Sequence, residues 1–89
     1  LYVARFLPDG SGVWLSLRHG QNGIGTGSRN YPFSDDADVL IHARLAADIA
    51  GATPLDRPEW AAVNPRNGEV YFTLTNNALR TRAAADAAN

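Results

Sequence analysis

Two clusters of turn-forming residues, each set between strand-prone runs, constrain the fold of this chain more than any other feature. The first cluster, Pro8-Asp9-Gly10-Ser11-Gly12, separates residues 1–7 from residues 13–18. The second, Asn64-Pro65-Arg66-Asn67-Gly68, separates residues 60–63 from residues 69–75 and contains an Asn-Gly pair, a strong hairpin signal. The flanking runs are rich in aromatic and β-branched side chains, which favour strands. The sequence therefore predicts two antiparallel β-hairpins.

Between the hairpins, the sequence predicts a long loop followed by a helix. Residues 19–33 contain four of the eight glycines and show no periodicity, which is typical of a loop. We expect its polar side chains to be solvated; they are His19, Gln21, Asn22 and Arg29. A helix is predicted from Ala37 to Ala50, where alanine and leucine are frequent.

Local signals mark the ends and the buried face of this helix. Ser34 is expected to cap its start and Gly51 to end it. Ile41, Leu45 and Ile49 recur every four residues and would form an apolar face. An extended conformation of residues 38–41 remains an alternative, because this stretch includes β-branched residues.

The order of these elements, ββαββ, indicates an α+β fold with two antiparallel hairpins and an intervening helix. The hairpins are expected to form one sheet covered by the helix, with Trp14 and Trp60 in the core. The alanine-rich residues 77–89 are expected either to form a short helix or to stay irregular. A chain of 89 residues is long enough for one small domain.

Composition excludes several classes of function. The chain has eight arginines, no lysine and nine acidic residues, for a net charge of −1, which argues against general nucleic-acid binding. It has no cysteine, so a disulfide framework and a thiolate metal site are both excluded. No apolar run approaches the roughly 20 residues of a membrane-spanning helix. The sequence shows no signal peptide, but a fragment would have lost one.

Charged and amide side chains with the chemistry of an ion-binding site cluster in the second half. Asp56, Arg57 and Glu59 surround Pro58, which fixes the local backbone, and Asn77 follows the last strand-prone run. Carboxylate and amide oxygens are ligands for hard cations such as calcium. The arginine fork matches two oxygens of a phosphate group. Glu59 is therefore a candidate metal ligand and Arg57 a candidate phosphate clamp, with Asp56 and Asn77 as further candidate ligands.

The same residues have a purely structural interpretation. Asp56 to Glu59 can be a surface turn in which Arg57 pairs with Asp56 or with Glu59, and Asn76 and Asn77 can form a turn that ends the strand. His42 lies four residues after Asp38, so a pair on the helix surface is expected there rather than a metal site. The residues alone do not decide between the two interpretations.

Several motifs resemble the PhoX-type alkaline phosphatases. They are Arg44-Leu45-Ala46-Ala47-Asp48, Gly51-Ala52-Thr53-Pro54, Asp56-Arg57-Pro58-Glu59-Trp60, Asn64-Pro65, Gly68-Glu69-Val70-Tyr71 and Thr73-Leu74-Thr75-Asn76-Asn77. Ala4-Arg5-Phe6, Asp9-Gly10 and Gly12-Val13-Trp14-Leu15 agree less specifically, and Leu55 stands where methionine is expected. The resemblance implies a secreted or periplasmic bacterial β-propeller enzyme that depends on calcium and iron and hydrolyses phosphate monoesters. Residues 1–89 would be an internal fragment from its blades.

The resemblance gives Arg57 the role of phosphate clamp and Glu59, Asp56 and Asn77 the role of metal ligands. The fragment alone is expected to be inactive and to hold no metal, because calcium needs six to eight oxygens. Its exposed strand edges favour association into a homo-oligomer. The alternative is a propeller module of the lactonase-like or non-enzymatic binding type, which has less use for an arginine beside Glu59.

Overall fold

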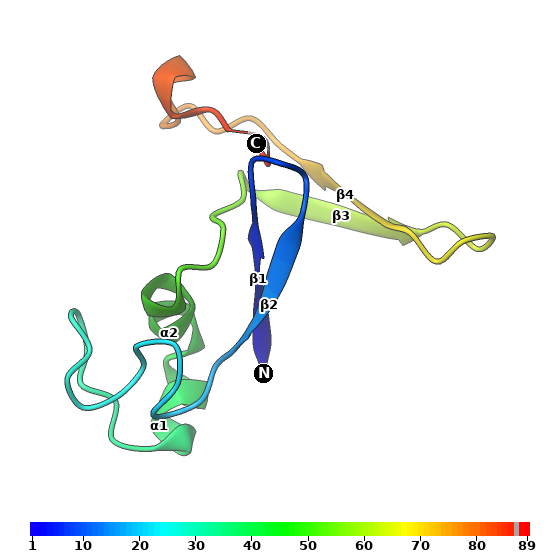
Figure 1. Cartoon of the computed structure of the whole chain (residues 1–89). Coiled ribbons are helices and arrows are strands. Elements are labelled where there is room, and N and C mark those ends of the chain that lie inside the picture. The colour runs from blue at the N-terminus through cyan, green and yellow to red at the C-terminus, as the bar shows by residue number, and fades with distance from the viewer. Residues whose placement is uncertain (87) are drawn as a thin grey trace. The chain divides into compact units, whose positions relative to one another are not determined.

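The computed structural model describes residues 1–86 and 88–89, which form two compact units, Leu1–Thr53 and Pro54–Asn89. Figure 1 shows the elements in chain order. They are β1 (Tyr2–Phe6), β2 (Gly12–Ser16), α1 (Asp36–Ile41), α2 (Ala43–Ala50), β3 (Pro58–Val63), β4 (Val70–Leu74) and the short 3-10 helix η1 (Arg82–Ala84). In the described part of the chain, no helix is long and apolar enough to cross a membrane.

Both predicted hairpins are confirmed, but they do not join into one sheet. β1 pairs with β2 in a register that places Ala4 opposite Trp14, and β3 pairs with β4 in a register that places Ala61 opposite Phe72. Each pair is a separate two-stranded antiparallel sheet, so the expectation of a single sheet is wrong. The α+β order ββαββ otherwise holds, with the helical segment divided in two.

The helical segment is broken at His42, which has non-helical dihedral angles of φ −107° and ψ 37°. The N-cap also lies one residue later than expected. Asp35, rather than Ser34, is the N-cap, because its carboxylate accepts a hydrogen bond from the backbone N–H of Asp38 at 2.8 Å. Gly51 ends α2 as predicted, in a left-handed conformation with φ 77°.

The buried face of the helices differs from the predicted one. Ile41 is 76% exposed and Leu45 37% exposed, whereas Ile49 is partly buried. The buried positions Val39, Ala46 and Ala50 lie on a different stripe of the two helices, so small side chains of α2 face inward instead. The core of the first unit comprises Leu17, Ile24, Phe33, Val39, Ala46 and Ala50.

The loop of residues 19–33 forms neither helix nor strand, as predicted, and its four selected polar residues are exposed. It nevertheless supplies two core side chains, because Ile24 is 1% exposed and Phe33 is fully covered. The N–H of Phe33 donates to the carbonyl of Gly25 at 3.0 Å. The loop is therefore a packed part of the first unit.

Arg5 fastens the first hairpin to the end of α2. Its Nε donates to the carbonyl of Gly51 at 2.6 Å, and its Nη2 donates to the carbonyl of Ala50. These carbonyls lie at a helix C-terminus, where no further turn of helix satisfies them and where positive charge is favourable. The N–H of Thr53 also donates to the carbonyl of Ala4 at 3.0 Å.

The second unit has a different character, because none of its described residues is fully buried. Every residue of β3 is exposed, and Trp60 is 73% exposed.

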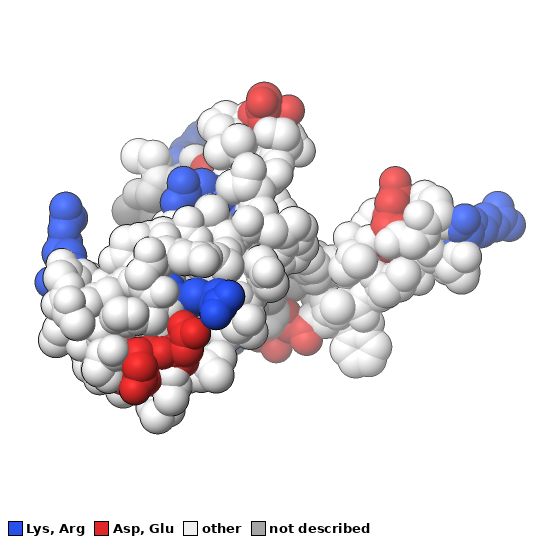
Figure 2. Space-filling view, turned by 60° about the horizontal axis from the view of Figure 1, so that its bottom comes forward, with Lys and Arg blue, Asp and Glu red and all other residues white. Residues whose placement is uncertain are grey.

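Trp14 of β2, in the first unit, is 75% exposed, so the expectation that both tryptophans lie in a core is wrong. Figure 2 shows both basic and acidic side chains on the surface, in keeping with the near-zero net charge.

Candidate functional site

The backbone at the start of β3 has an uncommon conformation. Arg57 has φ 49°, in the left-handed region that residues other than glycine seldom adopt. The carbonyls on both sides of this position are held by Thr75 at the end of β4. Its N–H donates to the carbonyl of Asp56 at 3.1 Å and to that of Arg57 at 3.3 Å. The hairpin ladder thus continues into the predicted site and fixes its backbone.

Arg57 and Glu59 lie together at this end of the hairpin and are accessible. The Nη2 of Arg57 is 3.9 Å from Oε1 of Glu59, and their side chains are 65% and 52% exposed. Nη1 of Arg57 also donates to the carbonyl of Asn76 at 3.3 Å. An exposed ion pair at this distance contributes little stability. The contact agrees with the surface-turn interpretation and also leaves both groups free to exchange partners.

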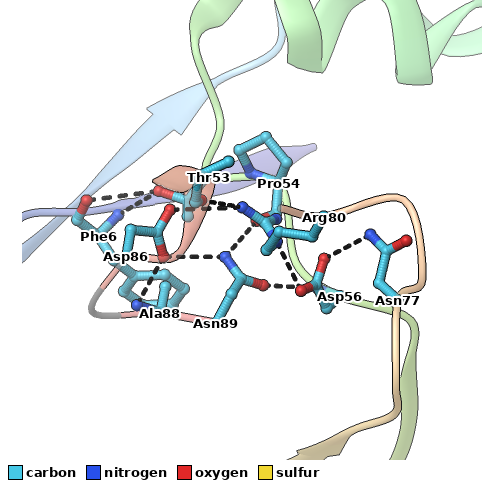
Figure 3. Close-up of polar contacts among 10 residues, drawn as sticks. Phe6, Thr53, Pro54, Asp56, Asn77, Arg80, Asp86, Ala88 and Asn89 are labelled. Carbon is cyan, nitrogen blue, oxygen red and sulfur yellow. Dashed lines mark hydrogen bonds and ion pairs between the residues drawn. The ribbon is translucent and has the colours of Figure 1, made fainter. Parts of the chain in front are cut away.

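Asp56 pairs with Arg80, a residue that the sequence analysis did not select. Its Oδ2 accepts a hydrogen bond from Nε of Arg80 at 2.5 Å, and its Oδ1 accepts one from Nδ2 of Asn77 at 2.8 Å (Figure 3). The side chains of Asp56 and Arg80 are only 13% and 19% exposed. The Asn77 hydrogen bond, followed by the Arg80 contact, holds the pKa of Asp56 below its usual value.

Asn77 uses both ends of its amide within the second unit. While its nitrogen donates to Asp56, its Oδ1 accepts a hydrogen bond from the N–H of Leu79 at 3.1 Å. This local bond is the strand-ending turn that the structural interpretation anticipated. The oxygen that would serve as a metal ligand therefore already has a donor.

The end of the chain completes the surroundings of Asp56. Asn89 accepts a hydrogen bond from the N–H of Asp56 at 2.6 Å and donates to the carbonyl of Pro54 at 2.9 Å (Figure 3). Arg80 donates through Nη1 to the carbonyl of Ala84 at 2.9 Å and lies 3.9 Å from Asp86. The alanine-rich tail thus folds into turns and η1 around the Asp56–Arg80 pair.

No group of three or more histidine or acidic side chains gathers in residues 1–86 and 88–89. Calcium takes about six to eight oxygens, and both carboxylate oxygens of Asp56 already accept hydrogen bonds. Glu59, with an exposed carboxylate, fits the role of a single ligand completed by others.

An open apolar groove lies beside Glu59. It is lined by Leu55, Pro58, Glu59, Trp60, Ala61 and Phe72. Because Trp60 and Phe72 are both exposed, the carboxylate of Glu59 sits at the border of an apolar surface. Such a surface lowers the local dielectric constant and strengthens the interaction of the carboxylate with a cation once other groups exclude water.

The two histidines lie in the first unit. Nε2 of His42 is 3.6 Å from the Asp38 carboxylate, as the spacing predicted. Asp38 also accepts hydrogen bonds from the backbone N–H of Ser34 and from the Tyr31 hydroxyl, each at 2.9 Å. The Ser34 bond is the main cause that lowers the pKa of Asp38, with Tyr31 contributing.

Comparison with known proteins identifies the family. The family model described as alkaline phosphatase PhoX matches residues 1–89. A solved structure, Pseudomonas fluorescens PhoX in complex with vanadate, a transition state analogue, is 55% identical with a TM-score of 0.77. The match covers 89% of this chain and 14% of that chain. No curated protein matches. Because the family model spans the whole sequence, the chain belongs to the PhoX alkaline phosphatase family.

Proposed function

We propose that this chain is part of a metal-dependent phosphatase that hydrolyses phosphate monoesters, with Arg57 binding the phosphoryl group and Glu59 ligating a metal ion. The family membership over residues 1–89 supports the assignment of the full-length protein, called the parent below, as a phosphatase. The related enzyme of known structure is described with vanadate, an oxyanion, as a transition state analogue. The substrate assignment extends this chemistry from the relative to the parent of the present chain.

The observation that carries the proposal is the pairing of an exposed guanidinium with an exposed carboxylate on a fixed backbone. Arg57 and Glu59 approach to 3.9 Å and remain more than half exposed, so neither is committed to its partner. A guanidinium can donate two parallel hydrogen bonds to a phosphoryl group. Charge that develops on the phosphoryl oxygens in the transition state strengthens those bonds, which lowers the barrier.

Calcium and iron are the proposed cofactors of the parent, where they would polarise the phosphoryl oxygens. In this chain Glu59 is the best-suited ligand, because its carboxylate is exposed. Asp56 and Asn77 remain predicted ligands, and each would have to exchange an existing hydrogen bond for the metal. The other ligands would come from elsewhere in the parent, so the 89-residue chain alone is expected to be inactive.

The β-propeller architecture of the parent and its secretion to the periplasm or beyond belong to the same proposal. The alternative is a propeller module that binds a ligand or acts as a lactonase. Arg57 distinguishes the two, because a phosphatase requires its positive charge and a lactonase-like calcium site does not. Substitution of Arg57 therefore tests the choice between these functions as well as the role of the residue.

The test uses the full-length protein that contains this segment, assayed with p-nitrophenyl phosphate. Arg57→Ala is expected to lower kcat/KM by about 10²–10³-fold, the loss typical of one donor to a developing oxyanion. Glu59→Gln is expected to lower the bound calcium measured by elemental analysis, together with activity. Arg66→Ala and Glu69→Gln, in and beside the β3–β4 turn, are matched controls. Near-normal turnover of both site variants would refute the proposal.

A further inference from the structure

The pair formed by Asp56 and Arg80 is tighter and better covered than the pair formed by Arg57 and Glu59. The first pair has a nitrogen–oxygen distance of 2.5 Å with side chains 13% and 19% exposed. The second has a distance of 3.9 Å with side chains 65% and 52% exposed. Charge-assisted hydrogen bonds of the first kind fix geometry, whereas the second kind permits exchange.

Asp56 directly precedes the left-handed residue Arg57, and all of its polar groups have partners. Its N–H is bound by Asn89, its carbonyl by Thr75, and its two carboxylate oxygens by Asn77 and Arg80. A left-handed arginine persists only where its surroundings hold it. Asp56 therefore helps to hold this conformation, together with the bond from the N–H of Thr75 to the carbonyl of Arg57.

The guanidinium of Arg80 donates hydrogen bonds from two of its nitrogens. Its Nε is bonded to Asp56, while its Nη1 donates to the carbonyl of Ala84 and lies 3.9 Å from Asp86. These contacts engage Nε and Nη1, so the geometry of Arg80 suits a residue that orients others. The exposed guanidinium of Arg57 is the one suited to bind a phosphate group.

We propose that Arg80 is a positioning residue, which holds the Asp56 carboxylate together with Asn77 so that the left-handed backbone aims Arg57 at the phosphoryl group. The inference rests on the function proposed for Arg57. Without Arg80, a largely covered carboxylate would lose its cation. The neighbouring guanidinium of Arg57 would then be drawn to Asp56 and away from the substrate.

The experiment measures steady-state kinetics of the full-length protein with p-nitrophenyl phosphate, and competitive inhibition by inorganic phosphate. Arg80→Gln is expected to lower kcat/KM about 10- to 100-fold, as a misaimed binding group would. The inhibition constant for phosphate is expected to rise in parallel. Arg80→Lys should restore part of the loss. Arg82→Gln, an exposed arginine in the same segment, is the matched control and should leave the kinetics unchanged.

A double-mutant cycle separates positioning from a merely structural role. If Arg80 acts through Arg57, Arg80→Gln adds no further loss of kcat/KM in the Arg57→Ala background. An equal loss in both backgrounds would overturn the inference, and so would a lowered melting temperature with unchanged kinetics. If Arg80→Gln does not yield folded protein, Arg80→Lys in both backgrounds decides by the same criterion.

The outcomes also distinguish this inference from the proposed function. Loss of activity in Arg57→Ala with normal kinetics in Arg80→Gln and Arg80→Lys would overturn the positioning role alone. Normal activity in Arg57→Ala would overturn the function proposed for Arg57, and the positioning role with it.

Discussion

The two units of this chain are stabilised by different kinds of contact. The first, Leu1–Thr53, has a hydrophobic core in which Phe33 and Val39 are fully covered. The second, Pro54–Asn89, consists of one hairpin and a tail joined by the Asp56–Arg80 network. None of its described residues is fully buried. The first unit thus contains its own apolar core, whereas the second is organised mainly by polar contacts.

This difference matters for function, because the candidate site residues lie in the polar unit. A two-stranded hairpin alone is marginally stable in water, and β3–β4 presents exposed aromatic side chains such as Trp60 and Tyr71. The chain corresponds to 14% of the length of its relative of known structure. We therefore expect the site to be rigid only in the full-length protein, whereas the first unit packs around its own core.

The largest expected effect comes from removing the central aromatic side chain of the first unit. Phe33→Ala is expected to cost about 3–5 kcal/mol of unfolding free energy, because it leaves a cavity in the core. A unit of this size has a total stability of only a few kcal/mol, so its backbone amides should lose their protection against hydrogen exchange. Hydrogen exchange of the 89-residue chain, followed by NMR, measures the loss for each unit.

Phe72→Ala on β4 is the matched substitution in the second unit. Phe72 is 44% exposed, so in the 89-residue chain its removal should cost less than about 1 kcal/mol. In the full-length protein a larger cost would show that other segments cover β4. Equal losses for Phe33→Ala and Phe72→Ala in the short chain would contradict the contrast between the two units.

A smaller loss of unfolding free energy is expected from alanine substitutions at two glycines that share the same left-handed conformation. Gly51 has φ 77° and Gly68 has φ 75°. A methyl group on Gly51 would overlap the Arg5 guanidinium, whereas nothing lies within 4 Å of one on Gly68. Gly68→Ala should cost about 1 kcal/mol for the backbone conformation. Gly51→Ala should cost about 2–3 kcal/mol, because the Arg5 hydrogen bonds are lost as well.

Hydrogen exchange of the amides in α2 and in β3–β4 provides the measurement, with each variant reporting on its own unit. A third variant, Gly10→Ala, supplies the control within the first unit, because Gly10 is left-handed but has open space around it. Similar costs for Gly51→Ala and Gly10→Ala would show that the Arg5 contact contributes little.

The smallest expected effect is the dependence of the stability of the first unit on pH. Asp38 has a pKa below the ordinary aspartate value of about 3.9, chiefly because the Ser34 N–H donates to it. A folded-state pKa that is lowered stabilises the fold above the unfolded value, and this contribution is lost as the pH falls through the folded value. The first unit should therefore lose stability as the pH falls below about 4.

Asp38→Asn should flatten this acid dependence, as measured by hydrogen exchange of α1 amides in wild type and variant at equal pH. Asp48→Asn, on the exposed side of α2, is the control and should keep the wild-type dependence. An unchanged slope in Asp38→Asn would show that its hydrogen bonds do not contribute.

Local signals in the sequence predicted the elements well but not their packing. The turn clusters after Leu7 and Val63 located both hairpins, because turn chemistry depends on adjacent residues. The buried helix face was wrong because the prediction followed the large side chains Ile41, Leu45 and Ile49, whereas the buried positions of α2 carry alanine. Ile24 and Phe33 lie in a stretch without periodicity, so their burial depends on tertiary contacts that a periodic pattern does not encode.

The same distinction applies to the candidate site. The proximity of Arg57 and Glu59 followed from their positions on either side of Pro58. Arg80 lies 24 positions from Asp56, in an alanine-rich tail without a recognisable motif. The hairpin β3–β4 and the turn at Asn77 bring the two together, so their pairing could be found only once the backbone path was known.

The hold of Arg5 on the end of α2 has a consequence for how the first unit opens. The bond spans 46 positions, so it closes nearly the whole unit into a ring. If the last turn of α2 frayed, Arg5 would lose the carbonyl groups that its side chain binds. The first hairpin and the end of α2 should therefore unfold together, as one cooperative block. Lengthening the irregular stretch inside this ring should weaken it only slowly, because closure entropy grows with the logarithm of the number of residues enclosed.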